Sequence, residues 1–179
     1  MFLHSLLQRD AWSSNVVQVL IGLSTLFLTS QISIPLHPVP ITLQTVGVMM
    51  VALSLPQRAA LQSIFSYVAL GALGLPIFAG FSGGFAKLLG PTGGYLIGFI
   101  AAVYLMARAK TFLGMTSGWR IFINCAFGQL CIYIFGIAWL AYVLGSLDKA
   151  ITLGLVPFIF PGIMKAFLLA FSFRYIHRK

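Results

Sequence analysis

Long apolar stretches recur along the chain at lengths able to cross a hydrocarbon layer of about 30 Å, which takes roughly 20 helical residues. Prolines and glycines interrupt them, as at Pro35, Pro56 and Pro76, and mark the ends of the first three. The pattern predicts an all-α integral membrane protein, a bundle of six transmembrane helices over residues 12–34, 41–55, 58–79, 92–110, 119–144 and 158–176. No linker divides the chain, so we expect residues 1–179 to form a single transmembrane domain.

Two segments need separate interpretation. Arg9 precedes the first apolar run as in a signal peptide, but the run is long and lacks a convincing cleavage site, so we expect a retained helix. Residues 145–157 are too short and too broken to span a membrane. We expect them to lie along the outer interface or to dip back into the membrane.

Composition supports the membrane prediction. Hydrophobic residues make up 60% of the 179 positions and charged residues only 7%, with a mean hydropathy of +1.01, whereas soluble domains carry roughly 25% charged residues. The net charge of +9 is also typical of nucleic-acid-binding proteins. Hydropathy argues against a nucleic-acid partner, because membrane proteins gather basic residues at their cytoplasmic ends and contact lipid elsewhere.

The distribution of basic residues predicts the orientation. With the N-terminus inside, the inner side holds eight of the eleven Lys and Arg residues, namely Arg9, Arg58, Arg108, Lys110, Arg120, Arg174, Arg178 and Lys179. The outer side holds Lys87 and Lys149. Since short loops follow the positive-inside rule, we expect a multi-pass protein of the cell membrane with both termini in the cytoplasm.

Lys165 is the remaining cation, and it lies within an apolar stretch shortly after Pro161. A charge there costs at least a few kcal/mol unless it finds a partner or water. One interpretation is a lysine that extends to the outer interface. The other is an outward-facing site in which Lys165, beside the positive end of the last helix, binds an anionic group such as a carboxylate.

A glycine-dense segment, residues 78–95, connects two predicted helices on the outer side. Gly83 and Gly84 let the backbone approach a ligand closely, and their exposed N–H groups can bind an oxygen-rich molecule. Tight turns between helices use glycine too, so this pattern alone does not decide. Lys87 in the same segment is either a solvated surface charge or a second cation at an entrance.

Four segments resemble the signature of the BioY family, the biotin-specific substrate-binding (S) components of energy-coupling-factor (ECF) transporters. They occur in the family's order as Gln31–Pro35, Val39–Gln44, Gly71–Gly80 and Gly90–Gly98. Weaker agreement continues to Lys165. The resemblance implies a six-helix S-component whose pocket near the outer face is closed by the loop between the first two helices and the loop after the third, with Lys165 as the family's last-helix lysine.

The resemblance also implies the function and the partners. It implies biotin uptake by a high-affinity binding subunit that is not an enzyme, with biotin as the transported ligand and no cofactor. A transmembrane coupling subunit and two ABC-type ATPases would supply the energy. The first helix of such subunits usually carries a small-xxx-small docking motif, which here is only approximated by Thr25 and Thr29 or by Gly22.

Biotin combines a carboxylate, a ureido ring and apolar parts, so a cation, a few polar groups and aromatic walls would complement it. Gln44 can pair with the ureido group or the carboxylate, and Phe78, Tyr95 and Tyr133 can pack on the apolar parts. Gln129 and Tyr133 are four residues apart and share a helix face. Taken singly, each of these residues also suits ordinary helix packing.

The chain departs from the family pattern at two positions. Gly162 stands where the family typically has an aspartate, three residues before the lysine, and Ser82 stands near a position where many relatives are basic. Asn124 and Gln129 are candidates to replace the lost acceptor. Because of Gly162, an S-component for another small carboxylated vitamin or precursor remains an alternative.

Missing motifs narrow the mechanism further. The sequence has no G-x-x-x-x-G-K-[ST] phosphate loop, and Asp10 and Asp148 are its only acids. The histidines, His4, His37 and His177, fit no metal-ligand spacing, so we expect neither a metal site nor a catalytic site. An ion-coupled carrier and a membrane enzyme are therefore disfavoured. A non-transport structural subunit remains an alternative, but it leaves Lys165 unexplained.

Overall fold

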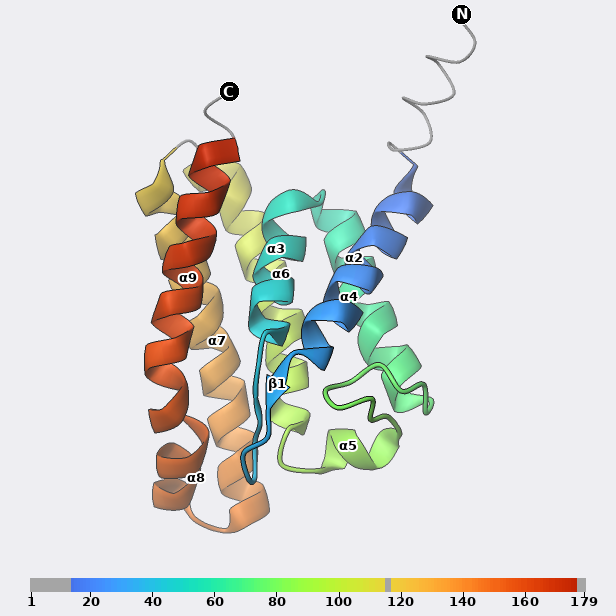
Figure 1. Cartoon of the computed structure of the whole chain (residues 1–179), viewed down its shortest axis with the longest axis vertical. Coiled ribbons are helices and arrows are strands. Elements are labelled where there is room, and N and C mark those ends of the chain that lie inside the picture. The colour runs from blue at the N-terminus through green and yellow to red at the C-terminus, as the bar shows by residue number, and fades with distance from the viewer. Residues whose placement is uncertain (1–13, 115–116, 177–179) are drawn as a thin grey trace, which may run out of the picture.

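The computed structural model describes residues 14–114 and 117–176 of the chain, and helices dominate these residues (Figure 1). The longer helices are α2 (Asn15–Gln31), α3 (Gln44–Ser54), α4 (Gln57–Ala72), α6 (Gly93–Leu113), α7 (Gly118–Leu144) and α9 (Val156–Ile176). Two short helices, α5 (Phe85–Leu89) and α8 (Leu147–Gly154), lie in connections. An antiparallel hairpin of β1 (Ser33–Ile34) and β2 (Ile41–Thr42) joins α2 to α3, with Ser33 opposite Thr42 and Ile34 opposite Ile41.

The longer helices run alternately up and down, so the connections gather at two ends of the bundle (Figure 1). The hairpin, α5 and α8 lie together at one end, which we call the hairpin end. The turns from α3 to α4 and from α6 to α7 lie at the opposite end, where α2 begins and α9 ends. This arrangement brings three connections that are distant in sequence to the same end of the bundle.

Three of the described helices are long and apolar enough to cross a membrane, over Gly93–Phe112, Gly118–Leu144 and Val156–Phe173. Helices α2 and α3 are apolar but shorter, with 17 and 11 residues, and α4 is less apolar. The chain is therefore a helical, multi-pass membrane protein, and the number of six spans stays a prediction. Part of the segment 145–157 forms α8 at the hairpin end.

Several helices are shorter than the sequence predicts. The predicted helices 12–34 and 41–55 give way to the hairpin at their facing ends. The predicted helix 58–79 ends at Ala72, because Gly74 takes a left-handed φ of 106° and Pro76 follows. Phe78 consequently lies in a loop, where it pairs with Ser82 through backbone hydrogen bonds.

Small residues bring the helices close together. A Cβ atom at Gly94 would lie 2.5 Å from the Phe135 carbonyl oxygen, and one at Gly98 would lie 3.0 Å from the Ile132 Cα, so α6 and α7 meet backbone to backbone. On α2, Gly22 packs against Ser63 of α4. This small residue of the first helix therefore contributes to packing within the chain.

Basic residues separate between the two ends. Arg58, Arg108, Lys110 and Arg120 lie where α4 and α7 begin and α6 ends, whereas Lys87 and Lys149 lie on α5 and α8 at the hairpin end. Lys110 also completes α3, because its ammonium group donates to the carbonyl oxygens of Leu53 and Leu55 at 3.1 and 2.6 Å. Arg9, Arg178 and Lys179 lie outside the described residues.

Candidate functional site

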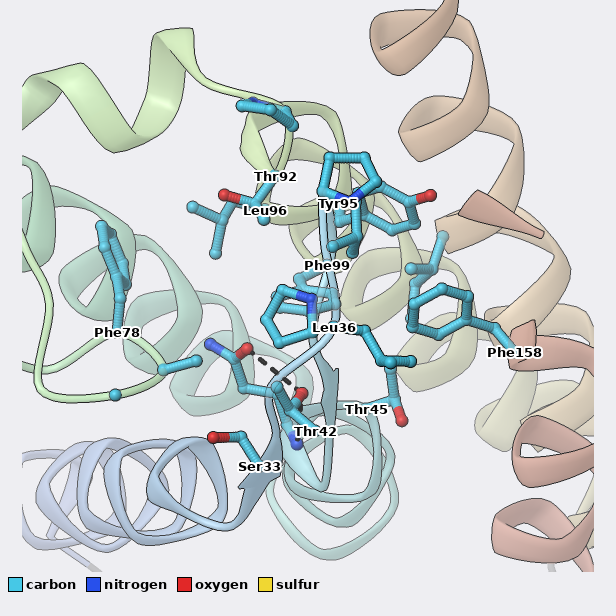
Figure 2. Close-up of a pocket in the computed structure, with 18 of the residues that line it drawn as sticks. Ser33, Leu36, Thr42, Thr45, Phe78, Thr92, Tyr95, Leu96, Phe99 and Phe158 are labelled. Carbon is cyan, nitrogen blue, oxygen red and sulfur yellow. Dashed lines mark hydrogen bonds between the residues drawn. The ribbon is translucent and has the colours of Figure 1, made fainter. Parts of the chain in front are cut away.

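A cavity of about 370 Å³ opens at the hairpin end of the bundle, within the size range of small-molecule sites (Figure 2). The hairpin loop, the start of α3, the loops around α5, and one face each of α6, α7 and α9 line it. Residues up to 132 positions apart therefore meet in one wall, since the lining runs from Ser33 to Lys165. No lining residue is acidic.

The hairpin loop, residues 35–40, forms one side of this cavity. The loop contains three prolines, which limit its backbone freedom, and Val39 is buried. Hydrogen bonds fix its base, where the Leu43 N–H donates to the Ile32 carbonyl oxygen at 2.9 Å. The loop is thus short and stiff, and its base is fixed between the end of α2 and the start of α3.

Lys165 projects from α9 into the same region and is about half-buried. Its ammonium group donates to the Thr42 carbonyl oxygen at 2.5 Å and to the Thr45 hydroxyl at 3.3 Å. Both partners are neutral, and the one acidic residue in the described part of the chain, Asp148, is exposed on α8. The cavity therefore holds a cation with no anion beside it, and the third ammonium proton is left for a ligand.

Gln44, at the start of α3, is buried in a polar network. Its Nε2 donates to the Tyr67 hydroxyl at 2.6 Å, and that hydroxyl donates to the Ile77 carbonyl oxygen at 3.0 Å. Ser30 donates to the same carbonyl at 2.8 Å. These bonds hold the loop that carries Phe78, whose ring meets Tyr67 edge to face at 5.4 Å.

Aromatic side chains form the apolar part of the wall. The Tyr95 hydroxyl donates to the Gly154 carbonyl oxygen at 2.8 Å, which fixes its ring 6.4 Å from that of Phe158. Phe99, one turn along α6 from Tyr95, also lines the cavity. Figure 2 shows Phe78 and Phe158 on opposite sides of the cavity, so an apolar ligand would have aromatic surface on both sides.

Gln129, Tyr133 and Gly162 line the wall between α7 and α9. The Tyr133 hydroxyl donates to the Phe158 carbonyl oxygen at 2.5 Å. A Cβ atom at Gly162 would overlap that hydroxyl, so the tyrosine fills the space that a side chain at 162 would need. Gln129 lies on the same face of α7, and its Oε1 is buried without a hydrogen-bond partner.

Most of the predicted site residues meet at this cavity. It is lined by Gln44, Phe78, Lys87, Tyr95, Gln129, Tyr133 and Lys165. Gly83 and Gly84 do not line it. Gly83 packs against the Leu75 carbonyl, and the Gly84 N–H donates to the Gly71 carbonyl oxygen at 2.7 Å, so these glycines shape the loop.

Asn124, the other candidate acceptor, is buried on α7 away from the cavity lining and donates to the Met106 carbonyl oxygen at 3.1 Å. Sequence reasoning missed Thr42 and Thr45, which hold Lys165. The available signal was weak, because two hydroxyl residues after Pro40 are as common in a helix start as in a binding site. In the described residues no cluster of three or more His, Cys, Asp or Glu side chains could hold a metal ion.

Comparison with known proteins identifies the family of this chain. The profile of the BioY family matches residues 5–179, nearly the whole chain. The chain belongs to the BioY family. BioY relatives include a probable biotin transporter of Pyrococcus horikoshii, 44% identical over 137 residues, which are 76% of this chain and 80% of the relative. The biotin transporter of Thermotoga maritima is 41% identical over 137 residues, covering 75% and 78% of the two chains.

A solved structure has the same fold. The crystal structure of the S-component for biotin from an ECF-type ABC transporter superposes with a TM-score of 0.78 at 27% identity, over 96% of this chain and 93% of that chain. The match therefore covers nearly the whole of both chains. A probable biotin transporter of Rickettsia prowazekii aligns over 95% of this chain at 33% identity.

Proposed function

We propose that this protein is the substrate-binding subunit of a biotin uptake transporter. Membership of the BioY family, relatives that are biotin transporters and the match to an S-component for biotin support this function. The family consists of transporter components, so the protein is not an enzyme. The observation that carries the proposal is the match to the biotin S-component across 96% of the chain.

The cavity chemistry supports the same ligand. Lys165 supplies a cation with a free proton, Gln129 supplies an acceptor, and Tyr95 and Phe158 supply aromatic surface. Biotin offers a carboxylate, a ureido ring with N–H and C=O groups, and an apolar bicycle and tail. Each part of the ligand therefore has a complementary group, and we propose that Lys165, Gln44, Phe78, Lys87, Tyr95, Gln129 and Tyr133 bind it.

We also propose the finer features of the transporter. Residues 1–179 form one transmembrane domain with six spans and both termini in the cytoplasm, and the cavity opens outward. A transmembrane coupling subunit and two ABC-type ATPases supply the energy, because the described cavity holds no acid for ion coupling and the sequence has no phosphate-binding loop. The structural match to a component of an ECF-type transporter supports these partners.

Equilibrium binding to the detergent-purified full chain tests the ligand. Biotin is compared with biotin amide, desthiobiotin and other small carboxylated vitamins, with thermal stability as a second measurement. We expect tight binding of biotin alone or with desthiobiotin, and at a hundred times its Kd a stabilisation of about 2.7 kcal/mol. Binding of a different vitamin in its place would overturn the biotin assignment, and stabilisation by no compound would favour a structural subunit.

Uptake of radiolabelled biotin tests the partners. Cells that express the chain with an ECF coupling subunit and its ATPases are compared with cells that carry an ATPase defective in ATP hydrolysis. We expect accumulation only with active ATPases, because the binding subunit has no energy source of its own. Equal accumulation in both strains would contradict coupling to ATP hydrolysis.

A further inference from the structure

Gln129 is an unusual residue for the interior of a membrane protein. The residue is 93% buried and lines the cavity, and its buried Oε1 atom has no hydrogen-bond partner. Buried acceptors are nearly always hydrogen-bonded, because leaving one without a partner is unfavourable. In a hydrocarbon surrounding the penalty has no relief from bulk water. An orphaned acceptor at a cavity therefore points to a donor on the ligand.

The neighbouring residues cannot supply that donor. The Tyr133 hydroxyl proton goes to the Phe158 carbonyl oxygen, and Gly162 has no side chain. A Cβ atom at 162 would overlap the Tyr133 hydroxyl and lie 3.4 Å from the Gln129 Cγ, so a larger residue cannot enter while Tyr133 keeps this position. Glycine at 162 thus leaves the wall between α7 and α9 with Gln129 as its open acceptor.

The same cavity is also lined by a cationic donor. Lys165 follows Gly162 by nearly one turn of α9, and two of its three ammonium protons go to Thr42 and Thr45. The wall therefore presents an acceptor at Gln129 and a cationic donor at Lys165. A carboxylate has no proton to donate at neutral pH and would leave Gln129 unpaired, whereas a cyclic urea carries N–H groups beside a carbonyl oxygen.

We propose that the Gln129 Oε1 accepts a hydrogen bond from a ureido N–H of the ligand and so selects for the cyclic urea. The inference rests on the proposed function, which names biotin as that ligand. It assigns Gln129 as a specificity-determining residue that acts in place of an acidic side chain at position 162. Tyr133 is a positioning residue, because its hydroxyl fills the space beside Gly162 and borders Gln129.

The test combines a variant with altered ligands. Gln129→Met keeps the approximate length and volume of the side chain and removes its amide group, including the acceptor. Binding of biotin and of its two mono-N-methyl derivatives is measured with wild type and variant in detergent. We expect the variant to bind biotin at least about tenfold more weakly, which is roughly 1.4 kcal/mol. One N-methyl derivative should bind wild type poorly, and its disadvantage relative to biotin should shrink in the variant.

A structural role predicts a different result. If Gln129 only packs, the variant loses thermal stability without ligand. It then keeps the wild-type ratio between its affinities for biotin and for each N-methyl derivative. We expect unliganded stability to change little, since the removed acceptor has no partner and the Tyr133 hydroxyl keeps its bond to the Phe158 carbonyl oxygen. An unchanged biotin affinity or an unchanged ratio overturns the inference.

The experiment distinguishes failure of the proposed function from failure of the role assigned to Gln129. Wild type that binds no biotin defeats the proposed function itself, whereas wild type that binds biotin beside an unaffected variant defeats only the assignment of Gln129. If the variant fails to fold, the wild-type protein alone still tests the inference. Equal affinity of the wild type for biotin and for both N-methyl derivatives would overturn it.

Discussion

Lys165 near the middle of the last helix donates a hydrogen bond to the backbone carbonyl of Thr42, 123 positions earlier in the chain. This contact joins α9 to the end of the hairpin, and the Thr45 hydroxyl beside it accepts a second bond. The cavity lies at this junction. A single cation thus touches both the hairpin wall and the space for a ligand, so changes at Lys165 are expected to affect binding more than folding.

We predict that Lys165→Met weakens biotin binding by about ten- to a hundredfold, because hydrogen bonds to charged groups contribute roughly 1.5–3 kcal/mol. Stability without ligand should change little, since Thr42 and Thr45 line the open cavity, where water can replace the ammonium group as a hydrogen-bond partner. Isothermal titration calorimetry and thermal unfolding in detergent measure the two effects.

Lys110→Met is the matched control for that substitution. Lys110 is also a half-buried lysine bonded to neutral oxygens, but it lies at the opposite end of the bundle. Its loss leaves two carbonyls at the end of α3 without a donor, so we expect a destabilisation of about 1–3 kcal/mol and unchanged biotin affinity. Equal losses of affinity in both variants would show that Lys165 acts only through stability.

Sequence reasoning named residues that meet at one cavity but misplaced several helix ends. Hydropathy and the position of Lys165 indicated a cation within an apolar helix, and family motifs named the residues opposite it. The hydropathy pattern predicts helix for most of the motif residues 31–35 and 39–44, whereas in the structure most of them form the hairpin and its loop. Apolar residues continue through both helices and hairpin, and hydropathy cannot separate them.

The contacts of the glycine loop also could not be predicted from the sequence. A positive φ at Gly84 suits both an anion-binding loop and a plain turn, and in the structure its N–H donates to the Gly71 carbonyl oxygen within the loop. Likewise the sequence shows that Gly162 lacks a side chain, but only the fold shows that Tyr133 occupies the vacated space. Both outcomes depend on contacts between residues distant in sequence.

The contact between Gly162 and Tyr133 predicts a compensating pair of substitutions. Gly162→Ala places a Cβ where the Tyr133 hydroxyl lies, so the tyrosine must move and give up its bond to Phe158. We expect this variant to lose about 1–2 kcal/mol of stability and to bind biotin more weakly. Tyr133→Phe removes the obstructing hydroxyl.

The double variant Gly162→Ala with Tyr133→Phe should therefore be more stable than the sum of the single changes predicts. Chemical unfolding of the four proteins gives the coupling energy, which we expect to be about 0.5–2 kcal/mol. Additive single effects would contradict direct contact between the two positions.

Close packing between α6 and α7 predicts a large effect at Gly94. A Cβ atom there would meet the Trp139 side chain and the Phe135 carbonyl oxygen, which is backbone and cannot move aside cheaply. We expect Gly94→Ala to destabilise the protein by about 2–3 kcal/mol, as overpacking commonly does. Gly90→Ala is the control, because its Cβ would lie 3.3 Å from the nearest atom, the Ala86 carbonyl oxygen. A similar melting temperature for both variants would contradict the tight interface.

The proposed orientation is tested by placing single cysteines at the two ends of the bundle. Lys149→Cys lies on exposed α8 at the hairpin end, and Thr111→Cys lies exposed in the last turn of α6 at the opposite end. The native Cys125 and Cys131 are buried, so the wild-type protein is the background control.

Basic residues at the Thr111 end favour the cytoplasm for that end. We therefore expect a membrane-impermeant maleimide to label Lys149→Cys in intact cells and Thr111→Cys only after permeabilisation. The expected pattern would place the opening of the cavity on the outer side, where an uptake subunit must meet its substrate. The reverse pattern would place the cavity on the cytoplasmic side and would rule out capture of external biotin in this conformation.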